Sequence, residues 1–89
     1  MPTVAFTSAL QRFLPVPATQ VPGGTVRDAL AAIFATRPAL RGYILDDQGV
    51  LRRHVNVFVN GELVHDRAGL TDKVDDADEI YVFQALTGG

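Results

Sequence analysis

The sequence predicts an α+β fold in which a mixed sheet of about four to five strands packs on one main helix. Residues 3–7 and 54–59 alternate apolar and polar side chains, a period of two that is typical of half-buried strands. Residues 26–34 instead repeat apolar side chains with the period of a helix. The length of 89 residues allows one small domain with a single core.

The N-terminal segment predicts a hairpin. In Thr3–Thr7, Val4 and Phe6 fall on one face of the first strand. A turn is expected near Ser8–Leu14, after which Val16–Val21 can pair back against the first strand. Prolines in and beside this second strand lack a backbone N–H donor, so we expect it at the edge of the sheet.

The main helix has clear start and stop signals. After a turn at Gly23-Gly24, Thr25 is expected to be the N-cap, with Asp28 as the acid of a capping box. Pro38 disfavours helical geometry at the preceding residue, so the helix is expected to end near Thr36. One apolar stripe is expected to face the core: Val26, Ala29, Leu30, Ile33 and Phe34.

A second hairpin is expected after the helix. Residues 40–45 form a short irregular or helical piece, which the turn at 46–49 closes. In His54–Val59 the three valines are expected to face the core. Asn60-Gly61 is a strong hairpin signal because both residues tolerate positive φ, and a short strand, Glu62–Val64, is expected to follow.

The last strand completes a recognisable order of elements. Leu70 and Val74 are expected to anchor a loop, and residues 75–78 turn into the final strand, in which Ile80 and Val82 face the core. A hairpin, a helix and then further strands suit a β-grasp. We expect this domain to cover residues 1–85 and a flexible tail to cover residues 86–89.

Two features of the final strand point to interactions. If this strand lies centrally beside the first, the outer face presents Phe58, Tyr81 and Phe83 as an aromatic patch, unless the chain itself covers them. The tail then ends in Gly88-Gly89. Glycine lets a partner approach the backbone closely, and the terminal carboxylate is the group that can react there. The competing interpretation is a passive, frayed end.

Composition narrows the function classes. The chain is 47% hydrophobic and 20% charged, as expected of a globular protein. It contains no cysteine, which excludes a disulfide, a thiolate nucleophile and a cysteine-based metal site, and fits a reducing cytoplasm. The longest apolar runs are too short to span a membrane, and the formal net charge of −2 argues against a nucleic-acid partner.

Other polar features are interpreted as structural or solvated groups rather than as catalytic or metal sites. They are Gly23-Gly24, His54, His65, Arg52-Arg53, Lys73 and the carboxylates of Asp75, Asp76, Asp78 and Glu79. The alternatives left open are phosphate binding, base or ligand chemistry at histidine, conjugation at the single lysine, and contact between the carboxylates and a basic partner. No phosphate-loop or metalloprotease spacing accompanies them.

The sequence resembles the MoaD/ThiS family of ubiquitin-like sulfur carriers over nearly its whole length. The segments that carry the resemblance are Thr25–Leu30, Leu51–Gly61 with its VNVFVNG run, Asp78–Ile80 and Thr87–Gly89. Two segments depart from the family pattern. Ala77 stands where members often have glycine, and Gln84-Ala85 stands where they often have proline before the tail.

The resemblance implies a carrier protein without catalytic residues, bound cofactor or metal of its own. A ubiquitin-activating-enzyme-like adenylyltransferase would use ATP to adenylate the carboxylate of Gly89, and a sulfur donor would convert it to a thiocarboxylate. Leu86, Thr87 and Gly88 would thread into the partner, since four extended residues reach about 13–14 Å. Phe58, Tyr81 and Phe83 would dock.

The sulfur acceptor would be a synthase subunit or another biosynthetic enzyme, with a molybdopterin-type pathway favoured over thiamine, cysteine and secondary-metabolite pathways. Two alternatives remain open. A ubiquitin-like modifier would join Gly89 to target lysines, and a small interaction subunit would carry a passive tail.

Overall fold

The computed structural model describes residues 1–6 and 17–84. Within these residues five strands form one mixed sheet in the order β2-β1-β5-β3-β4. The strands are β1 (Thr3–Phe6), β2 (Thr19–Gln20), β3 (Val55–Val59), β4 (Glu62–Leu63) and β5 (Glu79–Gln84). The helices are α2 (Val26–Thr36) and α3 (Pro38–Ile44).

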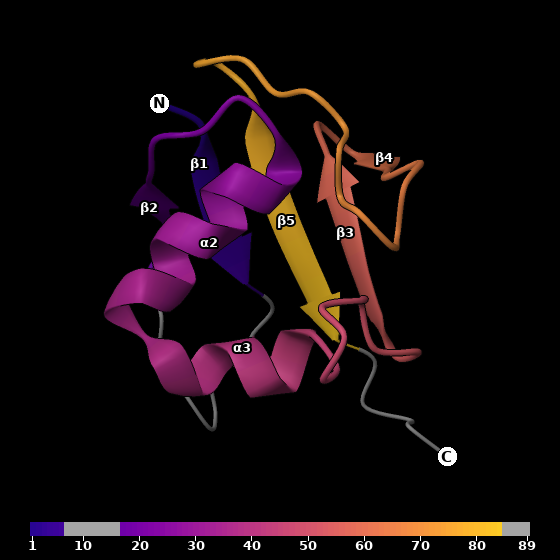
Figure 1. The fold of residues 1–89 in the computed structure, drawn as a ribbon. Helices are drawn as coiled ribbons and strands as arrows, with labels where there is room; N and C mark the ends of the chain where they lie inside the picture. Colours follow the sequence, from indigo (N-terminus) through magenta and orange to yellow (C-terminus); the bar gives the residue numbers. More distant parts are fainter. Residues whose placement is uncertain (7–16, 85–89) are drawn as a thin grey trace.

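The last strand lies at the centre of the sheet. β5 runs parallel to β1 and antiparallel to β3, while β2 and β4 are the two edge strands. α2 lies across one face of the sheet, and α3 follows near the end where β5 stops (Figure 1). The edge position expected for the second strand is therefore confirmed, but β2 is shorter than predicted, since residues 17–18 and Val21 are not part of it. Val16 and the expected preceding turn lie outside the described residues.

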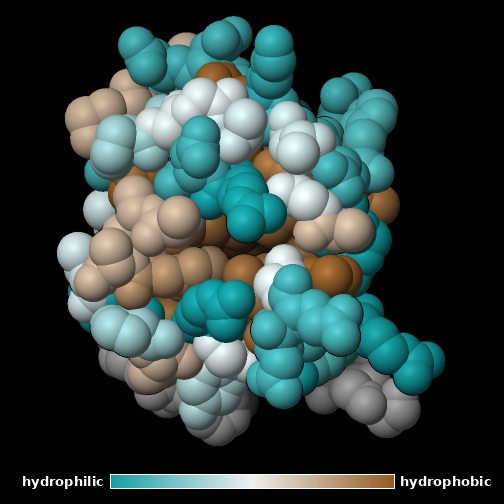
Figure 2. All heavy atoms as spheres, viewed as in Figure 1, coloured by the Kyte–Doolittle hydropathy of each residue, from teal (hydrophilic) through white to brown (hydrophobic). Residues whose placement is uncertain are grey.

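The core lies between the sheet and the helices. Its fully buried strand residues are Val4, Val55, Val57, Ile80 and Val82, each 0% exposed. Val59 is only partly buried and packs at the margin of this core. From the helix side, mainly hydrophilic residues are visible, with hydrophobic ones showing in a hollow between the elements (Figure 2). The alternation in the sequence therefore identified the inner face correctly.

Both helices begin and end where local chemistry dictates. The hydroxyl of Thr25 accepts a hydrogen bond from the Asp28 N–H at 3.1 Å, and α2 ends at Thr36 as predicted. The following segment, for which the sequence allows an irregular or a helical piece, forms the helix α3. Pro38 occupies its first turn, where a missing N–H costs nothing, and Leu40 and Ile44 are buried one turn apart.

The second hairpin has the predicted turn. Asn60 and Gly61 have φ values of 51° and 87°, and Val59 pairs with Glu62 across the two-residue connection. β4 ends at Leu63, one residue earlier than predicted. The Val64 N–H still donates to the Val57 carbonyl oxygen at 2.9 Å, but the chain then leaves the sheet and buries the Val64 side chain.

The remaining loops are held as the sequence indicates. Asp46 Oδ1 accepts hydrogen bonds from the N–H groups of Gln48 and Val50, which closes the predicted turn. Leu70 and Val74 are 2% and 6% exposed and anchor the long connection to β5. Within the described residues, no helix has both the length and the apolar character needed to cross a membrane.

Candidate functional site

The tail continues from the central strand of the sheet. β5 is paired on both sides: with β1 as far as Val82, which lies opposite Phe6, and with β3 as far as Gln84, which lies opposite Val55. A strand held on both edges is a stiff base for whatever follows it, because its backbone groups are bonded on each side. Four predicted site residues, Leu86, Thr87, Gly88 and Gly89, lie outside the described residues, as does the expected domain boundary after residue 85.

The aromatic residues predicted for docking come together on the face of the sheet away from the core. Phe58 pairs directly with Tyr81, and Phe83 lies two residues further along β5 on the same face. Tyr81 and Phe83 are 42% and 41% exposed, while Phe58 is half-buried. The structure therefore confirms the juxtaposition, and a role in partner binding stays a prediction.

The structure adds Leu63 to this face. Leu63 pairs with Phe58 across the second hairpin and is 49% exposed, and Ala5 pairs with Tyr81 on the other side. These residues form one row across four strands, and we call Phe58, Leu63, Tyr81 and Phe83 the outer-face patch. A hollow of about 390 Å³ lies beside it, lined in part by Ala5 and Tyr81. The two-residue turn could have predicted Leu63, because turn length sets the hairpin register.

A polar row borders the patch near the end of β5. Phe83 is paired with Asn56, whose Oδ1 accepts a hydrogen bond from Arg67 Nη1 at 2.7 Å. Arg67 Nη2 donates to the Arg52 carbonyl oxygen at 2.9 Å. Two hydrogen bonds thus hold a guanidinium beside the outer-face patch. Arg67 carries no local signal in the sequence, because its position depends on the path of a loop.

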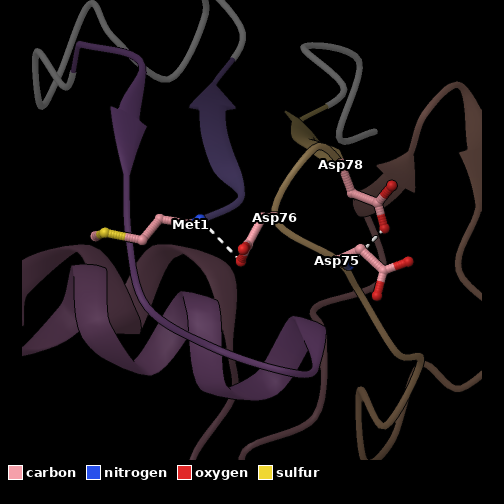
Figure 3. A network of polar contacts seen from close by, with 4 residues as sticks. All are labelled: Met1, Asp75, Asp76 and Asp78. Carbon is pink, nitrogen blue, oxygen red and sulfur yellow. Dashed lines mark hydrogen bonds and ion pairs between the residues drawn. The ribbon is translucent and has the colours of Figure 1, made fainter.

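The acidic cluster at the start of β5 closes a turn. Asp78 accepts hydrogen bonds from the Asp75 N–H and from Asn60 Nδ2, each at 2.7 Å, and these contacts lower its pKa. Asp76 lies 2.9 Å from the Met1 amine (Figure 3). A carboxylate with a lowered pKa stays ionised and is a weak proton donor near neutral pH, so the arrangement favours a structural role over acid–base chemistry.

Two further aspartates hold the loop after β4. Asp72 accepts from the backbone N–H groups of His65 and Asp66 at 2.9 and 3.0 Å, and the His65 N–H contributes most to lowering its pKa. Asp66 in turn accepts from the Thr71 hydroxyl at 2.6 Å and the Gly69 N–H at 2.9 Å, which lower its pKa in that order of importance. These carboxylates stabilise the loop.

The glycine pair before α2 is structural. Gly23 has φ 152°, and a Cβ there would lie 2.7 Å from the backbone nitrogen of Ala29, so the tight approach requires glycine. The first four N–H groups of α2 donate to protein oxygen atoms at 2.9–3.1 Å. No donor of that turn remains for a phosphate, which favours the structural interpretation over anion binding.

The remaining polar candidates are dispersed. His54 precedes β3, whereas His65 is exposed in the loop after β4. The lysine Lys73 is exposed, and its backbone pairs with Thr25 in an isolated bridge. Among residues 1–6 and 17–84, no group of three or more His, Cys, Asp or Glu side chains is arranged to hold a metal ion.

The fold and the chain's relatives define a small ubiquitin-like carrier or modifier protein rather than an enzyme. The ThiS family model matches residues 13–89, and the chain belongs to the ThiS family. Small archaeal modifier protein 1 of Haloferax volcanii is 38% identical over 65 residues, which cover 73% of this chain and 70% of that protein.

Solved structures agree on the fold. The crystal structure of SAMP1 from Haloferax volcanii has a TM-score of 0.79 at 30% identity and covers 99% of this chain and 98% of its own. A chain of the Amycolatopsis orientalis BexX/CysO complex has a TM-score of 0.83 at 24% identity over 100% of both chains. The predicted fold class, an α+β β-grasp with a mixed sheet and one main helix, and the predicted family are both confirmed.

Proposed function

We propose that this protein carries sulfur as a thiocarboxylate on Gly89. The observation that carries the proposal is the central position of β5, which ends one residue after Phe83 of the outer-face patch. The globule can then dock by its face while the tail enters a partner's buried site. Membership in the ThiS family supports this function.

The chemistry resides in the terminal carboxylate and in the partner. In an activating enzyme, a carboxylate oxygen of Gly89 attacks the α-phosphorus of ATP, and pyrophosphate leaves. The resulting acyl-adenylate is electrophilic, whereas a free carboxylate resists nucleophiles. Hydrosulfide, or an equivalent donor, then attacks the carbonyl carbon: the C–S bond forms, the C–O bond to AMP breaks, and AMP departs with the electron pair. The enzyme supplies positioning and charge stabilisation.

The carrier contributes a narrow C-terminal tail and a docking surface. Four extended residues, Leu86 to Gly89, reach about 13–14 Å, and Gly88 gives clearance beside the reacting carbon. Phe58, Tyr81 and Phe83 would contact a ubiquitin-activating-enzyme-like adenylyltransferase first. They would then contact a sulfur-accepting synthase subunit or biosynthetic enzyme. ATP is used by the partner, in the cytoplasm, and a molybdopterin-type acceptor is favoured.

Intact-mass analysis tests this proposal. The full chain is incubated with ATP, a cognate activating enzyme and sulfide, and we expect one oxygen to be replaced by one sulfur at Gly89. A variant lacking Gly89 should remain unmodified while keeping the same melting curve. An unchanged wild-type mass, with an enzyme that demonstrably activates another carrier, would contradict the proposal and favour a passive tail.

A second function, protein modification, is favoured by one observation: a 38% identical relative is a small archaeal modifier protein. In that case the same adenylate would react with a target lysine amine, forming an isopeptide bond and releasing AMP. The two functions share activation and differ in the product. Tandem mass spectrometry of ATP-dependent products separates them, since a modifier yields glycine–lysine linkages to other chains and a carrier yields a free thiocarboxylate.

A further inference from the structure

Arginines gather near one end of β5 and a group of carboxylates near the other, although Asp46 lies close to Arg52 at the arginine end. The pairing of Val55 with Gln84 places the segment just before β3 beside the end of β5, and Figure 1 shows that connection next to the strand's tip. The basic residues at this end are Arg52, Arg53 and Arg67, which we call the tail-exit arginines. The carboxylates at the opposite end are Asp75, Asp76, Asp78, Glu79 and Glu62.

Two of the tail-exit arginines, Arg52 and Arg67, are held by hydrogen bonds to neutral oxygen atoms. Arg67 donates to Asn56 Oδ1 and to the Arg52 carbonyl at 2.7 and 2.9 Å, and Arg52 Nε donates to the Gly42 carbonyl at 2.7 Å. These bonds position the guanidinium groups without neutralising their charge. They therefore present fixed positive charge near Phe83.

The positive charge is incompletely balanced by the protein. The Arg52 guanidinium contributes to the lowered pKa of Asp46, after the larger effects of the Val50 and Gln48 N–H groups. Arg53 is exposed, and among the described side chains none forms an ion pair with it or with Arg67. Guanidinium groups that lack a carboxylate within the chain are suited to one supplied by a partner.

The length of the tail indicates where on the partner the surface that meets the arginines would lie. Residues 85–89 span at most about 16–18 Å when extended. A fully threaded tail would hold its terminal carboxylate, and the nucleotide attached to it, near that distance from the end of β5. The tail-exit arginines would then lie outside the nucleotide site, so a protein surface at the mouth of the channel fits them better than a phosphate.

We propose that the tail-exit arginines dock on a carboxylate-rich rim around the channel through which the activating enzyme receives the tail. This inference rests on the proposed function and specifies the chemistry of its first partner. Phe83 and Tyr81 supply the apolar centre of the interface, and the arginines supply one charged side of its rim. Rim charges steer association and fix orientation, so they act before the chemical step.

Arg53→Glu in the full chain is the informative variant, because the Arg53 guanidinium makes no hydrogen bond to the described residues that its loss could break. ATP–pyrophosphate exchange by the cognate activating enzyme reports adenylation. Reversing one rim charge should raise the KM for the carrier about threefold to tenfold and leave kcat unchanged. The rise in KM with added salt should be smaller for the variant than for the wild type.

Arg27→Glu is the matched control, since it makes the same charge change at an exposed position on α2, on the opposite side of the sheet. Its KM should match the wild type. Equal effects of the two variants, or an unchanged KM for Arg53→Glu, would overturn the inference. A fall in kcat at constant KM would also overturn it, because it would place the arginine at the reacting phosphate. If wild-type carrier supports no exchange with an active enzyme, the proposed function itself fails.

Discussion

The two faces of the sheet use adjacent residues for different purposes. Ile80 and Val82 are 0% exposed beneath the helices, while their neighbours Tyr81 and Phe83 are 42% and 41% exposed on the other face. Both sets are hydrophobic, so composition alone does not distinguish them. The inner set completes a core without the outer set. Large hydrophobic side chains that the core does not need are therefore available to a partner.

The inner face should dominate stability. Ile80→Ala removes fully buried carbon atoms and leaves a cavity, so we expect a loss of about 2–5 kcal/mol in the free energy of unfolding. Leu63→Ala removes the same number of carbon atoms from a side chain that is 49% exposed and should cost less than about 1 kcal/mol. Urea denaturation measures both. Similar losses for the two variants would remove the distinction between the faces.

The outer face should dominate recognition. In the double variant Tyr81→Ser and Phe83→Ser, the Kd for the activating enzyme should rise about tenfold or more, because exposed aromatic anchors concentrate binding energy. Tyr43→Ser on α3 is a matched control, since Tyr43 is also 42% exposed but lies outside the patch. Calorimetric titration gives the comparison. A patch without a binding role would leave the two Kd values equal.

A smaller effect on stability is expected at acidic pH, in the loop that follows β4. The folded-state pKa of Asp72 lies below its ordinary value of 3.8, chiefly because of the His65 N–H. Its contribution to stability is therefore complete above that ordinary value and is lost as the pH falls through the folded pKa. Melting temperatures between pH 7 and pH 2 should show this loss.

Asp72→Asn is the corresponding variant. It removes the titration and one of the two acceptor oxygens, so the protein should be less stable at pH 7 and should depend less on pH below 4. Asp47→Asn, the same substitution at an exposed turn position, should leave the stability at pH 7 unchanged. If the stability of Asp72→Asn depended on pH as that of the wild type does, the protonation of Asp72 would not contribute to the acid-induced loss of stability.

Local patterns predicted most of the elements. The Thr25 cap and the proline after Thr36 set both ends of α2, because capping and backbone sterics act within a few residues. Asn60-Gly61 likewise predicted the hairpin. For the second helix the sequence allows either an irregular or a helical piece, although Pro38 at a first helical position is a recognised start signal. β4 was predicted one residue too long because the following loop draws Val64 into the core.

The candidate site was predictable only in part. Phe58, Tyr81 and Phe83 follow from strand alternation once β5 is placed centrally, and Leu63 from the register of a two-residue turn. Arg67 could not be inferred in this way. It reaches Asn56 because the loop after β4 runs back along the edge of β3, and no local pattern encodes that path.

The sequence by itself determined which residues share a face within each strand and helix, because the periods of two and 3.6 are properties of the local backbone. It also determined the hairpin turn and the helix cap, which depend on neighbouring residues. Only the tertiary structure decided that β5 lies between β1 and β3, with Ala5, Tyr81, Phe58 and Leu63 in one row. Strand neighbours are selected by the packing of distant segments on a common core, and that choice placed the aromatic face and the arginines near the end of β5.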